Sequence, residues 1–344
     1  MTEDLLSIDW SQVRPRRAAA GVLVVLAAFL IIGAAGTVGV TVGVAAIFVT
    51  AAAGDGSFRD RVPGMISFTL MGAAIGGLAF WSVDSVLAIA AILGGATFLG
   101  TLAAAYGPVP ARRGLFLTLW ALLALLLSSV DTSPWTAALA FLVGGTAAIV
   151  MTAIRLALSN EDPATDADPD GEEAADSAAV GEKPDIASVL RGPLGLFSVV
   201  RTVSVVAAVF LGYWWFSSYP LWAAITVIVV VRPVASESLK IAVERTLGTA
   251  VGVGLALVTA HVLPKSDVGI MVAFLLSAFL MLAFMNANYT LFATFLTSTI
   301  VFTERLVQAD AFEAGWQRLL ATAVGATIVI AAIWIGMLSE GRQE

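Results

Sequence analysis

Long apolar runs alternate along the chain with short breaks that contain charges, prolines or paired glycines. Most runs are near the length of about 20 residues that a helix needs to cross a bilayer, so the pattern predicts transmembrane helices. Cutting the chain at its breaks predicts an all-α polytopic membrane protein with about twelve spans in two groups of six. The predicted spans are 18–33, 37–53, 62–82, 85–105, 114–130 and 134–157, then 199–217, 220–231, 246–263, 268–285, 287–303 and 315–338.

The composition fits a protein that works inside a membrane. Hydrophobic residues make up 59% of the chain and charged residues 12%, against about 45–50% and about 25% in soluble domains. This excludes a water-soluble globule. The chain has no cysteine and one histidine, which leaves thiol chemistry and histidine-rich zinc sites without ligands. We therefore expect no metal, no cofactor and no nucleic-acid partner.

The formal charge of −7 is concentrated in one segment. Residues 161–185 hold ten acidic side chains and one lysine, and the rest of the chain carries a net +2. A segment with this charge and without apolar periodicity cannot bury enough surface to fold by itself. We predict a first six-helix half over 1–158, an acidic disordered cytoplasmic linker over 159–190 and a second six-helix half over 191–344. A regulatory or partner-binding role for the linker is the alternative.

Basic residues indicate how the spans are oriented. With the N-terminus inside, the twelve predicted spans place fifteen of the eighteen Lys and Arg on the cytoplasmic side and leave Lys265, Arg305 and Arg318 outside. We therefore expect a multi-pass protein of the plasma or inner membrane with both termini in the cytoplasm. Aromatic residues at one outer turn, from Tyr219 to Trp222, are interpreted as interfacial anchors rather than as a ligand cage.

A repeat within the second half is the strongest signal in the sequence. Residues 231–252 match residues 304–325 at a constant offset of 73, and Gly72 precedes Gly145 by the same step. We interpret this as a three-helix unit present four times. Each half then holds two inverted repeats and the two halves run parallel, an architecture typical of transporters. The matched pairs are Arg232 with Arg305, Glu237 with Asp310, Arg245 with Arg318, Thr249 with Thr322 and Gly252 with Gly325.

The paired arginines Arg245 and Arg318 are the leading candidates for an anion site. They are predicted at the N-terminal ends of spans that enter from opposite faces, where the helix dipole also favours anions. The positive-inside rule by itself would account for Arg245, and an ion pair with a nearby carboxylate is the alternative for Arg318. The predicted substrate-binding residues are Arg245, Arg318, Arg232, Arg305, Trp222, Thr226, Thr249, Thr322 and Tyr289.

Carboxylates and glycines near these arginines have other predicted roles. A carboxylate near the membrane can exchange a proton as access alternates, although interfacial ion pairing is the simpler role. Small residues let helices approach closely. The first half has Thr69 and Leu142 at the positions of the two arginines, so it is expected to be structural. The candidates for coupling or gating are Glu237, Glu244, Asp310 and Glu304, and those for helix packing are Gly248, Gly252, Gly325, Gly72 and Gly76.

Two motifs in the second half resemble a known family. The first is a Pro-x-Trp-Ala-x-x-Thr span and the second an Arg-x-x-Gly-Thr-x-x-Gly helix, which lie within residues 220–226 and 245–252. Together they resemble the fusaric acid resistance, or aromatic acid exporter, family. The resemblance implies an inner-membrane exporter of aromatic carboxylic acids that is driven by the proton gradient. Many members carry a large cytoplasmic domain, whereas this chain has the acidic linker in its place.

The membrane part is also similar to the plant aluminium-activated malate transporters, which are dimeric anion channels. This similarity implies a homodimer and leaves a passive anion channel as the alternative to a secondary transporter. A non-transporting membrane scaffold is the hypothesis from another class. No P-loop, His-Glu-x-x-His motif or nucleophile with a histidine partner occurs in the sequence, so an enzyme is not expected. The expected partners are the lipid bilayer, a small organic anion, protons and a second copy of the chain.

Overall fold

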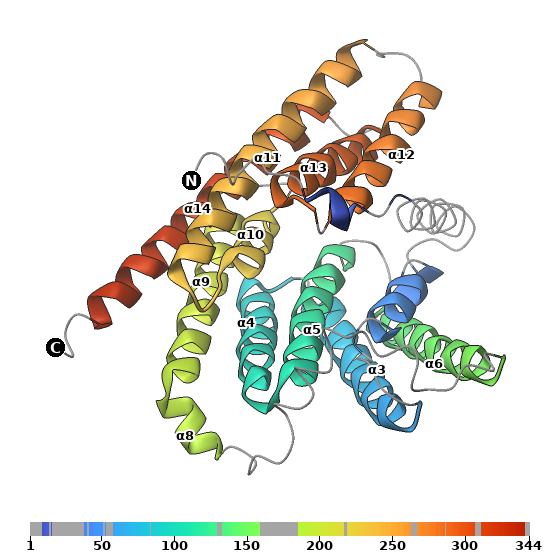
Figure 1. Cartoon of the computed structure of the whole chain (residues 1–344), viewed down its shortest axis with the longest axis vertical. Helices are drawn as coiled ribbons and strands as arrows, with labels where there is room; N and C mark the ends of the chain where they lie inside the picture. The colour runs from blue at the N-terminus through green and yellow to red at the C-terminus, as the bar shows by residue number, and fades with distance from the viewer. Residues whose placement is uncertain are drawn as a thin grey trace. The chain divides into compact units, whose positions relative to one another are not determined.

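The computed structural model of the chain is helical in the part that it describes (Figure 1). No strand occurs within that part, which agrees with the predicted all-α class. The described residues are 9–13, 15, 38–39, 41–50, 52, 58–82, 84–128, 133–158, 185–216, 219–262, 267–285, 287–306 and 311–340. The first predicted span, 18–33, lies outside them.

Eleven labelled α-helices and two short 3₁₀ helices follow one another along the described chain. Residues 41–50 form a further apolar helix. The α-helices are α3 (Phe58–Trp81), α4 (Val86–Leu102), α5 (Pro108–Leu127), α6 (Pro134–Leu158), α8 (Ile186–Arg191), α9 (Pro193–Trp215), α10 (Trp222–Val230), α11 (Ala235–Val262), α12 (Asp267–Phe284), α13 (Tyr289–Leu306) and α14 (Ala311–Glu340). The 3₁₀ helices are η1 (Trp10–Gln12) and η2 (Ala103–Tyr106).

Turn and cap residues explain where several of these helices begin. The Ser85 side chain accepts a hydrogen bond from the Ala88 N–H at the start of α4, which satisfies one of the free donors of a first turn. Gly107 has a φ of 109°, a conformation that glycine adopts without strain. Pro108 then occupies the first position of α5, where a missing N–H costs no hydrogen bond.

Seven helices in the described part are long and apolar enough to cross a membrane. This agrees with a multi-pass membrane protein, while the total of twelve spans and their inverted repeats stay predictions. The seven candidate spans are Arg61–Trp81, Val86–Tyr106, Pro108–Leu127, Pro134–Ile154, Pro193–Trp215, Ala235–Val262 and Phe312–Ile335. Shorter apolar helices lie at Thr41–Thr50 and Val268–Phe284.

The chain forms two compact units, and each is described by itself. One unit comprises Met1–Phe29 and Ala207–Glu344, and the other comprises Leu30–Val206. The predicted division at 158 and 190 stays a prediction. Residues 159–184 of the predicted linker lie outside the described residues, and α8 begins within its last part, where the Asp185 side chain accepts hydrogen bonds from the first turn.

In the unit of residues 30–206, α3 packs against both α5 and α6. Gly72 on α3 leaves room for the ring of Phe141 on α6, because a Cβ at Gly72 would overlap that ring. The Trp120 indole N–H of α5 donates a hydrogen bond of 2.7 Å to the Gly72 carbonyl oxygen. The Trp120 and Phe141 ring centroids are 4.4 Å apart. Aromatic side chains therefore fill this crossing.

The other unit is organised by two helix pairs, α11 with α13 and α10 with α14. A Cβ at Gly252 on α11 would lie 2.9 Å from the Thr297 Cβ of α13 and closer still to the Thr294 carbonyl oxygen. A Cβ at Gly325 on α14 would lie 2.6 Å from the Thr226 Cβ of α10. Glycine at these positions lets the helix backbones approach closely. Figure 1 shows α11 and α14 as the longest ribbons of this unit.

An apolar cluster at one end of this unit fixes α12 beside α11 and α13. Apolar side chains packed in this way hold helices together through close van der Waals contact. The cluster therefore joins α11, α12 and α13. Its buried members are Ala256, Ile270, Phe274, Val301 and Phe302.

Candidate anion-binding site

Two arginines lie buried inside the unit formed by α10 to α14. Arg245 comes from α11 and Arg318 from α14, and their exposed fractions are 3% and 2%. The two positive charges are close enough to act on each other. A buried charge without a counter-charge is costly, because the protein interior does not replace the solvation that water gives. This pair therefore favours an anion at the same place.

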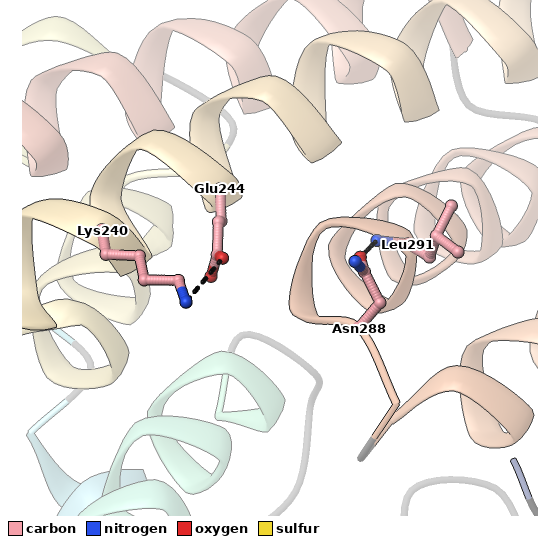
Figure 2. A network of polar contacts seen from close by, with 4 residues as sticks. All are labelled: Lys240, Glu244, Asn288 and Leu291. Carbon is pink, nitrogen blue, oxygen red and sulfur yellow. Dashed lines mark hydrogen bonds and ion pairs between the residues drawn. The ribbon is translucent and has the colours of Figure 1, made fainter. Parts of the chain in front are cut away.

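Tyr289, the first residue of α13, contacts Arg245. The Arg245 Nη1 donates a hydrogen bond of 3.1 Å to the Tyr289 hydroxyl. Tyr289 also lies within electrostatic range of Arg318. The preceding residue, Asn288, caps the helix, because its Oδ1 accepts a hydrogen bond of 2.9 Å from the Leu291 N–H (Figure 2). The cap fixes where α13 begins and so positions the tyrosine.

Trp222, the first residue of α10, contacts Arg318. The guanidinium carbon lies 4.9 Å from the centroid of the indole ring, which is within the range of a cation–π interaction. Tyr219 stacks on the same indole, with ring centroids 3.9 Å apart and an angle of 8° between the ring planes. The aromatic rings thus hold the arginine without using its N–H groups.

Several polar groups at the site have no acceptor or donor among the described residues. They are the Nε and Nη1 of Arg318, the Nε of Arg245, and the hydroxyls of Thr226 and Thr290. Buried polar groups in proteins almost always have partners, so unpartnered ones need a physical reason. A bound oxyanion would supply acceptors for the arginine N–H groups.

The arginines do not lie at helix N-terminal ends, and that prediction is wrong. The helix α11 begins at Ala235 and α14 begins at Ala311, so Arg245 and Arg318 each lie more than one turn inside. The helix dipole acts mainly within the first turn. The predicted spans began too late because charged residues in the first turns of both helices interrupt the apolar runs.

Two other helices begin at the site instead. The first residues of α10 and α13 are the two aromatic residues that contact the arginines, Trp222 and Tyr289. The residue before α10, Leu221, provides no side-chain hydrogen bond to the first turn. N–H groups of a first turn and the positive end of the dipole favour anions. Two helix starts and two arginines therefore combine at one place.

The segment that carries this site matches a known family. Residues 205–332 match the family described as Fusaric acid resistance protein-like. The second half of the chain is similar to fusaric acid resistance proteins. No match was found among curated proteins or among solved structures. The match confirms the resemblance seen in the motifs, and it indicates a membrane transporter or exporter of the fusaric acid resistance type.

The predicted threonines lie within the segment that matches the family. Thr249 and Thr322 are buried and stand four residues after Arg245 and Arg318, so each shares a helix face with its arginine. Thr226 is buried on α10, one turn after Trp222. Thr249 and Thr322 thus lie on the helix faces that carry the arginines, whereas Thr226 packs against Gly325 of α14.

The other two predicted arginines are less buried than Arg245 and Arg318. Arg232 is exposed before α11, and its backbone N–H donates a hydrogen bond of 2.8 Å to the Ser238 hydroxyl. Arg305 is half-buried in the last turn of α13. Their predicted role in binding stays a prediction.

The predicted coupling carboxylates fall at different places. Glu244 is buried on α11, and its carboxylate lies 4.0 Å from the Lys240 ammonium one turn earlier (Figure 2). Glu237 is exposed in the first turn of the same helix. Glu304, near the end of α13, accepts a hydrogen bond from the Tyr219 hydroxyl. Asp310 lies outside the described residues.

Tyr219 is a residue of the site that the sequence did not assign to it. Burial raises the pKa of Tyr219 above its usual range, and the hydrogen bond to Glu304 together with the charges of Glu304 and Glu313 raises the pKa further. The hydroxyl therefore stays protonated and remains a donor. Its position three residues before Trp222 could have indicated that the two rings lie together. The sequence pattern instead favoured an anchor at the membrane interface as the interpretation of this aromatic cluster.

The first half has a different arrangement at the matching positions. Thr69 donates its hydroxyl to the Met65 carbonyl oxygen at 2.7 Å, and Gly145 packs against its side chain. No arginine stands there, and Leu142 replaces the second one. The expected structural role of this half stays a prediction.

Proposed function

We propose that the protein is an inner-membrane secondary transporter that exports amphipathic aromatic carboxylates in a proton-coupled cycle. The observation that carries this proposal is the buried pair of Arg245 and Arg318. The Nε of Arg245 and the Nε and Nη1 of Arg318 lack acceptors among the described residues. The match of the surrounding segment to the fusaric acid resistance proteins supports it.

The chemistry of the pair favours a carboxylate. A guanidinium binds a planar carboxylate through parallel N–H···O bonds, and the starts of α10 and α13 favour the same charge. Each such bond to a charged group contributes about 1.5–3 kcal/mol. An anion bound there would also neutralise the repulsion between the arginines.

The surroundings favour an aromatic rather than a strongly hydrated anion. The residues that contact the arginines are Trp222 and Tyr289, and the buried Ala223 and Ala224 follow Trp222 on α10. Aromatic side chains interact with other rings in stacked or edge-to-face arrangements. A benzene ring attached to the carboxylate would find apolar contacts there, which a small inorganic ion could not make.

Coupling to protons and assembly as a homodimer belong to the same proposal. Glu244, which precedes Arg245 on α11, and Glu304, which contacts Tyr219, are the carboxylates that we propose to carry the proton. The resemblance to dimeric malate channels supports a dimer. If crosslinking in the membrane yields only monomers, the proposed homodimer is wrong.

We expect the full-length protein in proteoliposomes to transport benzoate, cinnamate or phthalate in response to a pH gradient. Protein-free vesicles measure the diffusion of the neutral acids, which is subtracted. Arg245→Ala and Arg318→Ala should each lower the flux at low substrate concentration by about 100-fold, the equivalent of two lost charge-assisted hydrogen bonds. The matched control is Arg191→Ala, which removes an exposed arginine of α8 without a predicted role in binding and should leave the flux unchanged.

The result also separates this proposal from its alternatives. Flux that follows only voltage and concentration, and that is lost in the same two variants, would identify a passive anion channel. No protein-dependent flux of any of the three acids would contradict transport and favour the scaffold hypothesis.

A further inference from the structure

Four side chains form a continuous series from the end of α13 to the buried arginines. Glu304 accepts a hydrogen bond from Tyr219. Tyr219 stacks on Trp222 at 3.9 Å between ring centroids, and Trp222 contacts Arg318 at 4.9 Å. Glu304 and Tyr219 therefore connect the end of α13 to the indole that contacts Arg318.

Trp222 needs support from outside its own helix. It is the first residue of α10, a helix of 9 residues whose preceding residue, Leu221, provides no side-chain cap. The start of a short helix without a cap is the part that frays most readily. The stacked ring of Tyr219 restricts the indole, and the hydrogen bond to Glu304 restricts that ring in turn.

The orientation of Arg318 depends on the indole. A cation–π contact holds the guanidinium through its charge and does not require hydrogen bonds, so its N–H groups remain available to a ligand. The Nε and Nη1 of Arg318 can donate to a ligand, because neither has a partner among the described residues. If the indole turned away, the long arginine side chain would gain rotamer freedom that anion binding must then remove.

The helix α13 links the two arginine contacts. Its first residue, Tyr289, accepts the hydrogen bond from Arg245, and Glu304 stands near its end. These residues are about 22 Å apart along the helix axis at 1.5 Å per residue. Glu304 contacts Tyr219, Tyr219 stacks on Trp222, and Trp222 contacts Arg318. These contacts connect the end of α13 with the arginine pair, which Tyr289 contacts at the start of the same helix. One rigid helix thus sets the position of both guanidinium groups.

We propose that Glu304 and Tyr219 form a positioning pair that holds Trp222 against Arg318 and thereby sets the affinity for the anion, although neither residue touches the anion. This inference rests on the proposed function, in which the two arginines bind a carboxylate. It assigns Tyr219 to the binding machinery rather than to the membrane interface alone.

The test measures binding of radiolabelled benzoate to the purified full-length protein in lipid nanodiscs. Tyr219→Phe keeps the stacked ring and removes the donor, and Glu304→Ala removes the acceptor. We expect each change to raise the Kd about tenfold, the loss expected for one hydrogen bond to a charged group. The double variant should be no weaker than either single one, because both remove the same bond. Glu304→Gln keeps an acceptor oxygen and should restore most of the affinity.

Controls separate positioning from a general loss of structure. Tyr213→Phe removes the hydroxyl of an exposed tyrosine in α9 and should leave the Kd unchanged. In proteoliposomes Tyr219→Phe should raise KM while kcat stays near the wild-type value. A role in stability alone would instead lower Tm and leave the Kd of the folded fraction as it was.

The outcomes distinguish the two proposals. A Kd of Tyr219→Phe within twofold of wild type, with binding lost in Arg318→Ala, would overturn the positioning pair and leave the anion site standing. Additive effects in the double variant would overturn it as well. Benzoate binding that survives in Arg318→Ala, or a wild-type protein that does not bind benzoate, would overturn the proposed function and this inference together.

Discussion

Replacing Arg318 by methionine is expected to abolish anion binding and to raise the Tm of the ligand-free protein. The guanidinium is 2% exposed, lies within range of the charge of Arg245, and has two N–H groups without acceptors. Exchanging buried charged groups for apolar ones of similar volume stabilises some proteins by about 1–4 kcal/mol. Methionine also fills the space of the aliphatic part of the arginine.

The Tm is measured by tryptophan fluorescence on heating, with and without benzoate. Wild type should gain stability from benzoate, about 2.7 kcal/mol at a concentration of 100 times Kd, and the variant should gain none. Arg191→Met is the matched control, because this side chain of α8 is exposed, and it should keep both the Tm and the response to benzoate. A lower Tm for ligand-free Arg318→Met would show that the arginine stabilises the empty protein, contrary to our interpretation of its unpartnered groups.

The sequence predicted the bounds of most helices within a few residues. It did so where the apolar run and the helix end at the same place. The predicted span 134–157 corresponds to α6, which begins at Pro134, and the predicted span 268–285 corresponds to α12, which ends at Phe284. Proline at a helix start and charged loops are local signals that do not depend on the packing of other helices.

The start of α11 was missed for a physical reason. Hydropathy predicted a span from residue 246, whereas the helix begins at Ala235. The intervening side chains Glu237 and Lys240 are exposed, so a helix can carry them on a solvated face. Hydropathy marks where a helix is apolar and not where its hydrogen bonds begin.

The sequence also singled out Arg245 and Arg318 as a pair, because the repeat aligned them. It could not show which helices supply their contacts. Trp222 comes from α10 and meets an arginine of α14, and Tyr289 comes from α13 and meets an arginine of α11. Each arginine is therefore contacted by a helix from the other predicted repeat unit. These contacts depend on the packing of helices that are far apart in the sequence, which the sequence pattern does not give.

The glycines show the same exchange in their backbone contacts. A Cβ at Gly252 would meet the carbonyl oxygen of Thr294 and the Cβ of Thr297 on α13. A Cβ at Gly325 would meet the carbonyl oxygen of Ala223 and the Cβ of Thr226 on α10. In both cases the second atom belongs to a threonine three residues after the first. The two crossings thus have the same local geometry, and both hold a helix whose first residue contacts an arginine.

We therefore expect Gly252→Ala to destabilise the protein and to weaken anion binding together. The new Cβ would overlap the Thr294 carbonyl oxygen, which is backbone and cannot turn away as a side chain can. The Ser298 hydroxyl also donates a hydrogen bond of 2.9 Å to the Gly252 carbonyl oxygen, and this bond would be strained. Overpacking of a close-packed contact costs about 1–3 kcal/mol, so a clear fall in Tm should follow.

The neighbouring glycine of the same helix provides the control for this prediction. Gly254 is exposed, and a Cβ there would have no atom within 4 Å. Gly254→Ala should leave benzoate binding unchanged and raise stability by about 0.5–1 kcal/mol, the difference in helix propensity between the two residues. In Gly252→Ala, movement of α13 would carry Tyr289 away from Arg245, so the Kd should rise even for the folded fraction. A wild-type Kd in that variant would mean that the crossing stabilises the fold without positioning the arginine, and the link between helix packing and the site would then be wrong.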